Sequence, residues 1–313
     1  MKRLVLTGIA LAMLLAACGR ESSAPGPRPT PTPTVAGPSV AAGRTVKDMI
    51  GRDVAVPEQV RRVVALSPSG VDFAMSLGLE LAGRPTDAPN APEGIPDVGS
   101  SLMPDFAAVA EQRPDLVLGD AALHGARLRD FEQFPYPVFV LKASSYQDIL
   151  QALTALGQVT GRDAEAETRV AEIEERVNAA KARGEGQPAP NVLILTGSGR
   201  EVYAGSDSTY VGDLVRLLGG KNILGNTPQG APIAGFGLVE LAQLASLDPD
   251  VVLLIASGQG DLADTIRTSP EWQSTRAVAN GQVYELDTLR WLRSPGPRVA
   301  EAVEELAEML YPS

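Results

Sequence analysis

The sequence predicts an α/β protein with two Rossmann-like lobes joined by one long α-helix. Residues 163–183 read as an uninterrupted helix, and short apolar strands alternate with helices on both sides of it. The two sides also echo one another, because residues 106–118 read FAAVAEQRPDLVL and residues 241–253 read LAQLASLDPDVVL. The prolines at positions 114 and 249 set this repeat at an offset of 135 residues. Two related halves on either side of a helix are therefore expected.

The central helix is the best specified element. Val170, Ile173, Val177 and Ala180 recur at spacings of three and four, which places them on one helical face. No Gly or Pro interrupts the segment, and Gly184 suits the position just after the helix ends. At about 1.5 Å per residue, the helix would be roughly 30 Å long. An ordinary surface helix is one interpretation; a stiff spacer between two lobes is the one that the repeated flanks favour.

The other elements follow from short apolar runs and from helical spacing. Before the central helix, strands are expected at residues 61–66, 115–119 and 137–141, a strand with a loop at residues 98–103, and helices at residues 71–79, 104–112, 123–131 and 146–159. After it, strands are expected at residues 191–196, 251–256 and 282–286, and helices at residues 208–218, 238–246 and 298–310. Such alternation predicts a parallel sheet covered on both faces. The first lobe would span residues 44–142, the connecting helices 143–186 and the second lobe 187–313.

The N-terminus predicts export and a lipid anchor. Lys2 and Arg3 precede a short apolar run at residues 4–17, which resembles a signal peptide more than a membrane span. The letters LAAC that end at Cys18 resemble the lipobox of bacterial lipoproteins. In that class the matching Cys is acylated with lipid and becomes the new N-terminus; an uncleaved anchor with an incidental Cys is the alternative. The signal peptide would be residues 1–17, and the rest of the protein would lie in the periplasm or at the cell surface.

Composition narrows the function. Residues 18–43 are rich in Pro, Ser, Thr and Gly and predict a disordered tether. Removal of the signal peptide, which holds two basic residues and no acid, would change the formal net charge from −11 to −13. An acidic chain without Lys/Arg clusters is a poor nucleic-acid binder. His124 is the only histidine, which argues against a multi-histidine metal site, and no cofactor is expected.

An ordered set of segments resembles a known family. In the first half, the resemblance is seen in RVVALSP at residues 62–68, which precedes a helix that ends in Leu-Gly, and in the Pro-Asp turn and strand that begin at Pro114. In the second half, it is seen in YVGDL at residues 210–214, GGKN at 219–222, the Pro-Asp turn and strand that begin at Pro249, and SPGPR at 294–298. Together they resemble the substrate-binding proteins of ABC importers for iron complexes and cobalamin, over residues 46–312. The resemblance implies a siderophore, haem or cobalamin ligand in a cleft between the lobes, and a permease dimer as partner. Loops at the carboxyl ends of parallel strands suit such a cleft.

Candidate ligand residues lie in loops at these strand ends. His124 could ligate the metal of haem or cobalamin, and Met103 could offer a thioether to haem iron, although a surface-loop histidine and an apolar packing role are the alternatives. Some haem receptors of the family use a Met from the first lobe and a His from the second, but the second half contains no His. The full set of predicted ligand-binding residues is Ser67, Ser101, Met103, His124, Tyr203, Tyr210, Arg290, Trp291 and Arg293.

The aromatic and basic candidates belong to the second half. Tyr203 and Tyr210 could be phenolate ligands or stacking surfaces, or simply buried tyrosines with one hydrogen bond. Arg290 and Arg293 flank Trp291, an arrangement that suits a carboxylated macrocycle or an anionic siderophore. A solvated loop is the alternative interpretation of this segment.

The resemblance also implies one carboxylate per lobe for docking on the permease. Asp105 and Glu240 are the candidates, because each precedes its Pro-Asp turn by nine residues, at prolines 114 and 249. Asp105 could instead be a helix-start residue favoured by the helix dipole. Two other functions are alternatives. One is a zinc or manganese receptor of similar architecture, which would need more histidines, and the other is a hydrolase. The chain has no Gly-x-Ser-x-Gly motif, P-loop or dinucleotide fingerprint, so an enzyme is not expected.

Overall fold

Two β-sheets organise the chain in the computed structural model, which describes residues 43–132, 134–197, 201–226, 233–256 and 262–312. All of these residues belong to one compact unit, residues 37–313. The predicted signal peptide, Cys18 and the tether as far as residue 42 lie outside the described residues. Within the described part, no helix has the length and apolar character needed to cross a bilayer.

The first sheet is wholly parallel, as expected. Its strands run in the order β4 (Glu80–Gly83), β3 (Arg62–Ala65), β7 (Leu116–Asp120) and β8 (Val138–Leu141). The strand and loop expected at residues 98–103 do not join this sheet: β5 (Gly99–Ser100) and β6 (Met103–Pro104) form a small antiparallel hairpin instead. Gly99 adopts a φ of +89°, where a side chain would meet the backbone of Asp105, so the chain turns back on itself.

The second sheet is mixed rather than wholly parallel. Strands β9 (Asn191–Gly197), β13 (Val251–Ala256) and β14 (Val283–Asp287) are parallel, and the short β11 (Lys221–Asn222) pairs with β9 in the same sense. Strands β10 (Val202–Gly205) and β12 (Phe236–Val239) add an antiparallel edge. The helix expected at residues 238–246 is correspondingly shorter, because Leu238 and Val239 pair with β10 and α8 spans only Leu241–Leu244.

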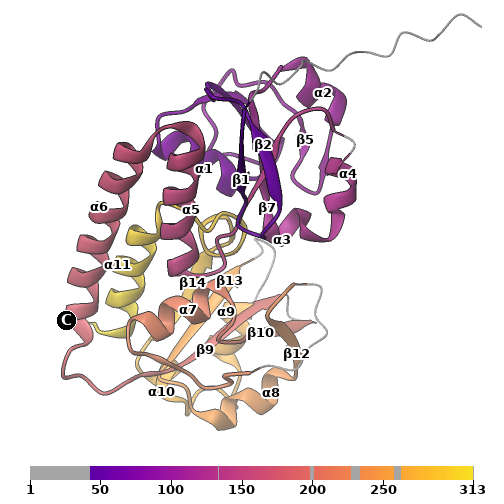
Figure 1. Ribbon diagram of the computed structural model, residues 1–313. Coiled ribbons are helices and arrows are strands. Elements are labelled where there is room, and N and C mark those ends of the chain that lie inside the picture. The colour runs from indigo at the N-terminus through magenta and orange to yellow at the C-terminus, as the bar shows by residue number, and fades with distance from the viewer. Residues whose placement is uncertain (1–42, 133, 198–200, 227–232, 257–261, 313) are drawn as a thin grey trace, which may run out of the picture. The chain divides into compact units, whose positions relative to one another are not determined.

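The long helix α6 (Asp163–Lys181) lies beside α5 (Tyr146–Thr160) and α11 (Val299–Leu310), as Figure 1 shows. Gly161 ends α5 in the left-handed conformation, and α6 follows almost at once. Ile173, Val177 and Ala180 of α6 are buried, as predicted, whereas Val170 is only partly buried. The bidentate ion pair of Arg176 with Glu304 of α11, at 2.7 and 2.8 Å, adds a polar link to this apolar contact.

The remaining elements are short and cover the sheets or their edges. They are the hairpin β1 (Arg44–Lys47) and β2 (Asp53–Val56), the helices α1 (Pro68–Ser76), α2 (Phe106–Glu111), α3 (Ala121–His124), α4 (Leu128–Glu132), α7 (Tyr210–Leu217), α9 (Leu262–Thr268) and α10 (Arg276–Ala279), the 3₁₀ turns η1 (Gly125–Arg127), η2 (Ala182–Gly184) and η3 (Ala245–Leu247), and the π-helical turn η4 (Leu289–Arg293).

The core follows the alternation of side chains along the strands. In the first sheet, Val63 and Ala65 face one apolar cluster while Val64 faces another. In the second sheet, Ile194 and Leu195 divide in the same way. The largest cluster contains residues of both sheets and of α5, α6, α7 and α11, so the two lobes share one continuous interior.

Candidate ligand-binding cleft

A cavity of about 540 Å³ opens between the two lobes and is lined by both of them. Every strand of the first sheet contributes to it at its carboxyl end. Pro68 follows β3, Asp87 follows β4, Ala122 follows β7 and Ala143 follows β8. Carboxyl ends of parallel strands meet at one edge of a sheet, so this wall is a direct product of the topology.

The second lobe forms the opposite wall from three segments. These are residues 208–211 at the start of α7, residues 233–236 before β12, and residues 291–295 in and after η4. Thr209 caps α7 by accepting a hydrogen bond from the backbone N–H of Gly212 at 3.0 Å, which fixes the helix start in the wall. The sequence also predicts cleft loops at residues 197–200, 227–236 and 257–259, and of these, residues 198–200, 227–232 and 257–259 lie outside the described residues.

Four of the predicted ligand residues line the cavity: Ser101, Tyr210, Trp291 and Arg293. Tyr210 is the first residue of α7 and is 8% exposed, and burial raises the pKa of its hydroxyl, so it stays protonated at neutral pH. Trp291 is 1% exposed and presents its ring within a π-helical turn, a local geometry that recurs at functional sites. Most of the other lining residues are apolar, and the larger of them are Leu102, Leu123, Val211, Ile233, Phe236 and Leu292.

Arg293 reaches across the cavity to Asp87 of the first lobe. Asp87 also accepts hydrogen bonds from the backbone N–H and the hydroxyl of Ser101, both at 2.8 Å. Burial works against ionisation of Asp87, but the two Ser101 hydrogen bonds and the charge of Arg293 outweigh it and lower the pKa of the carboxyl below 3.8. Both charges of the pair are therefore present at neutral pH.

His124 is placed inside the first lobe and does not line the cavity. Its Nδ1 accepts the backbone N–H of Asp120 at 2.9 Å, so Nε2 carries the proton and donates to the carbonyl of Ser101 at 2.8 Å. The ring is 1% exposed and meets Phe131 edge to face. Burial lowers the pKa of His124, so the ring is neutral and both nitrogens are engaged. This placement differs from both interpretations of the sequence, a metal ligand and a surface-loop histidine.

Ser67, like His124, is buried behind the cavity wall. Its hydroxyl oxygen accepts the backbone N–H of Gly70 at 3.0 Å and caps α1, and the same side chain hydrogen-bonds the carboxyl of Asp120. Asp120 itself caps α3 through the backbone N–H groups of Ala122 and Leu123, and burial raises its pKa. These groups fix the loops that carry the lining residues.

Three further predicted residues are not among those that line the cavity. Met103 lies on β6 and is 73% exposed. The hydroxyl of Tyr203 donates to Glu201 at 3.2 Å. Arg290 pairs with Glu305 of α11 at 2.7 Å, so the two arginines beside Trp291 diverge and only Arg293 faces the ligand space.

Sequence reasoning missed Asp87, Ala143 and Pro295. Asp87 follows a four-residue strand, ELAG, that carries too little apolar signal to be recognised. Ala143 follows an expected strand, and ligands bind at the carboxyl ends of parallel strands, so this rule was sufficient to find it. Within the described residues, no group of three or more His, Cys, Asp or Glu side chains could hold a metal ion, which offers no support for a zinc or manganese receptor.

The two predicted docking acids occupy equivalent places in the two lobes. Asp105 caps α2 by accepting the N–H groups of Ala107 and Ala108, and Glu240 stands at the same position before α8 without a side-chain cap. Their backbone angles are close, with φ/ψ of −87°/99° and −92°/110°. Both side chains are exposed, and each follows an exposed apolar residue two positions earlier, Met103 at 73% and Leu238 at 59%.

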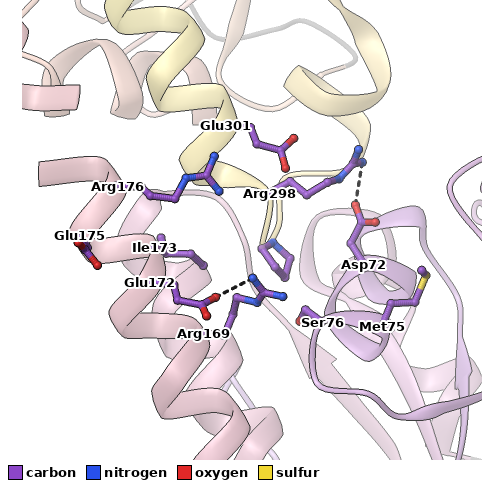
Figure 2. Close-up of a pocket in the computed structure, with 11 residues that line it drawn as sticks. Asp72, Met75, Ser76, Arg169, Glu172, Ile173, Glu175, Arg176, Arg298 and Glu301 are labelled. Carbon is purple, nitrogen blue, oxygen red and sulfur yellow. Dashed lines mark hydrogen bonds and ion pairs between the residues drawn. The ribbon is translucent and has the colours of Figure 1, made fainter. Parts of the chain in front are cut away.

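A second hollow of about 420 Å³ lies where α1, α6 and the start of α11 meet (Figure 2). Its walls carry acids and arginines that pair with one another, including Arg169 with Glu172 at 2.9 Å and Arg298 with Asp72 at 3.0 Å. Most of its lining residues are charged, whereas the walls of ligand pockets are mostly hydrophobic and aromatic side chains. The interlobe cavity is therefore the better candidate for a ligand.

Comparison with known proteins agrees with this geometry. The family model described as periplasmic binding protein matches residues 63–288. The chain is 25% identical to the Fe(3+)-citrate-binding protein YfmC of Bacillus subtilis (strain 168), over 86% of both chains. It is 24% identical to the high-affinity heme uptake system protein IsdE of Staphylococcus aureus (strain MRSA252), over 78% of this chain and 86% of that one. The petrobactin-binding protein YclQ of Bacillus subtilis has a similar fold, with a TM-score of 0.76 at 21% identity over 86% of this chain and 99% of that one.

Proposed function

The chain belongs to the periplasmic binding protein family, and from this premise we propose that it captures an iron complex (a siderophore complex or haem) or cobalamin for an ABC importer. The interlobe cavity carries the proposal, because both lobes supply its walls and a ligand there would contact each of them. The names of the relatives YfmC and IsdE support an iron-containing ligand. The role of a binding protein rather than an enzyme is also consistent with a cavity whose described lining does not include the only histidine, His124.

The lining favours a ligand with a large apolar surface and few negative charges. Among the described lining residues Arg293 is the only cation, and Asp87 already neutralises it. Trp291 and Tyr210 offer aromatic surface for a flat or macrocyclic ligand. His124 and Met103 are not among the described residues that line the cavity, so neither is proposed as a ligand of the metal.

Anchoring and docking complete the proposed role. The signal peptide at residues 1–17, acylation of Cys18 and the tether at residues 18–43 would hold the lobes at an extracytoplasmic membrane surface. Asp105 and Glu240 would face basic side chains of the permease, one acid on each lobe. Their matched backbone and exposed neighbours support this role, since a dimeric permease has two equivalent subunits to contact.

Ligand titration of the mature protein tests the proposal. Haemin, cyanocobalamin, ferric citrate and a ferric hydroxamate would be added in turn while tryptophan emission and ligand absorption are followed. One ligand class should bind saturably at one site per chain and quench Trp291, which lines the cavity. Failure of all four to bind, or turnover of a chromogenic ester by the protein, would count against a receptor for these ligands.

A further inference from the structure

Asp72 of α1 holds the segment of the second lobe that leads out of the cleft. Its carboxylate accepts the hydroxyl of Ser294 at 3.0 Å and the guanidinium of Arg298 at 3.0 Å, the contact drawn as a dashed line in Figure 2. It also accepts the side-chain amide of Asn90 in its own lobe at 2.8 Å. With a side-chain exposure of 10%, this acid is nearly enclosed by its three donors.

A second contact from the same helix joins the same segment. The hydroxyl of Ser69 donates to the carbonyl of Pro295 at 2.6 Å. Residues 294–298 follow directly on Trp291 and Arg293, and Pro295 is itself a lining residue. Prolines at 295 and 297 restrict the backbone between these contacts, so a constraint at Ser294 and Arg298 is transmitted to the cleft wall.

The carboxylate of Asp72 stabilises the side chain of Arg298 in its position. It stands at the N-cap position of α11, where the helix dipole disfavours a cation, and its side chain makes no cap hydrogen bond. Its Nε is buried and has no hydrogen-bond partner among the described residues. The carboxylate of Asp72 supplies the opposite charge that offsets both penalties.

We propose that Asp72 is a positioning residue of the cleft, which fixes Trp291 and Arg293 of the second lobe at a set distance from the first lobe through Ser294 and Arg298. The contacts of α1 then add a non-covalent link between the lobes to the covalent one through α6. The identity of the ligand in the cleft rests on the proposed function, but the position of Trp291 can be measured without any ligand.

Tryptophan emission provides that measurement. The chain has two tryptophans, and Trp272→Phe leaves Trp291 as the only reporter. Trp272 belongs to a different apolar cluster and its indole N–H has no partner among the described residues, so Phe retains most of its contacts. In this background, Asp72→Ala should shift the emission of Trp291 to longer wavelength and increase its quenching by acrylamide. Ser69→Ala, which removes one contact only, should give a smaller change in the same direction.

Asp48→Ala is the matched control. Asp48 is also a buried acid, 5% exposed, that holds an arginine, but Arg52 and its other donors all lie in the first lobe. This variant should lower the melting temperature and leave the emission of Trp291 unchanged. Affinity for whichever of haemin, cyanocobalamin, ferric citrate or ferric hydroxamate binds the Trp272→Phe protein should fall about tenfold in Asp72→Ala, a loss of about 1.4 kcal/mol, and not in Asp48→Ala.

The outcomes separate the two proposals. Unchanged emission and quenching of Trp291 in folded Asp72→Ala protein would overturn the positioning role, whatever binds. If Asp72→Ala does not fold, unchanged values in Ser69→Ala would overturn it instead. A shifted emission in a protein that binds none of the four complexes would sustain the positioning role and remove the proposed ligand class.

Discussion

Asp87 and Arg293 form an ion pair that joins the two lobes across the cleft, from the loop after β4 to the π-helical turn η4. Because Asp87 is also held by Ser101, its position is fixed before the arginine reaches it. A ligand with a carboxylate would compete with Asp87 for the guanidinium. In the proposed function, the pair would therefore discriminate among ligands by charge.

Removal of Arg293 should weaken binding of an anionic complex such as ferric citrate about tenfold, the effect of one lost charged hydrogen bond. Asp87→Asn should strengthen it, since the competing charge is gone. Titration calorimetry would measure both. Arg290→Ala is the matched control, because Arg290 adjoins the same tryptophan but pairs with Glu305 outside the cleft. Equal losses in the two arginine variants would show that Arg293 makes no direct contact with the ligand.

Protonation of His124 should destabilise the protein in mild acid. Burial lowers the pKa of His124 from 6.5, so below that pH the unfolded chain binds more protons than the folded one, and the stability present at neutral pH is lost as pH falls. Protonated Nδ1 can no longer accept the backbone N–H of Asp120. The slope should approach about 1.4 kcal/mol per pH unit between pH 6.5 and the lowered pKa of the folded protein.

Urea unfolding of the wild type and of His124→Asn over this pH range would test the histidine prediction. Asn offers an oxygen in place of Nδ1 and does not titrate. Acidification also protonates Asp120, whose pKa burial raises, and this change favours the folded state as pH falls. Because the two groups interact, the difference between the two proteins reports the loss of His124 together with its effect on Asp120. Parallel curves for the two proteins would mean that His124 does not titrate in this range.

Ile173 should be a main contributor to the attachment of α6. It is 2% exposed and packs into the apolar cluster shared by the lobes, so Ile173→Ala should lower the free energy of unfolding by about 2–5 kcal/mol. Glu174→Ala, at the exposed next position, should change it by less than about 0.5 kcal/mol. Denaturant midpoints would measure both. A small loss at Ile173 would indicate that α6 contributes little to the core.

Neutralising Asp105 and Glu240 together should abolish uptake and leave ligand affinity intact. Asp105→Asn keeps an acceptor for the N–H groups of Ala107 and Ala108, so α2 retains its cap while the charge is lost. Transport into cells and equilibrium binding would be compared. The control is Glu167→Gln with Glu271→Gln, two exposed acids outside the repeated positions. Normal transport by the first pair, or an equal defect in the second, would refute the docking assignment.

Much of the fold could be predicted because its signals are local. The apolar run at residues 115–119 and the helical spacing within residues 163–183 specify β7 and α6 by themselves. The region from Leu238 to Ser246 could not be resolved in this way. The apolar residues of this region are compatible with a strand or a helix. Leu238 forms a strand because it pairs with β10, which is distant in sequence.

The sequence could predict which loops lie at the cleft, but not which of their side chains point into it. The rule of carboxyl ends identified the loops that contain Ser101 and Trp291, and both residues line the cavity. His124 follows a strand end as well, yet its ring turns inward because the carbonyl of Ser101, from another loop, accepts its N–H. Asp72 lay within an expected helix, and its partners in the second lobe, Ser294 and Arg298, are more than 200 residues away, so no local pattern could reveal its role.

The last helix, α11, has a consequence for how the chain is made. Val303 and Leu306 of α11 are fully buried in the interior that both lobes share, and Arg298 at its start is bound by the first lobe. Neither half can complete its interior until α11 has been synthesised. A chain truncated before residue 299 would keep that apolar surface open to aggregation and proteolysis. The finished protein should melt in a single cooperative transition, despite its two sheets.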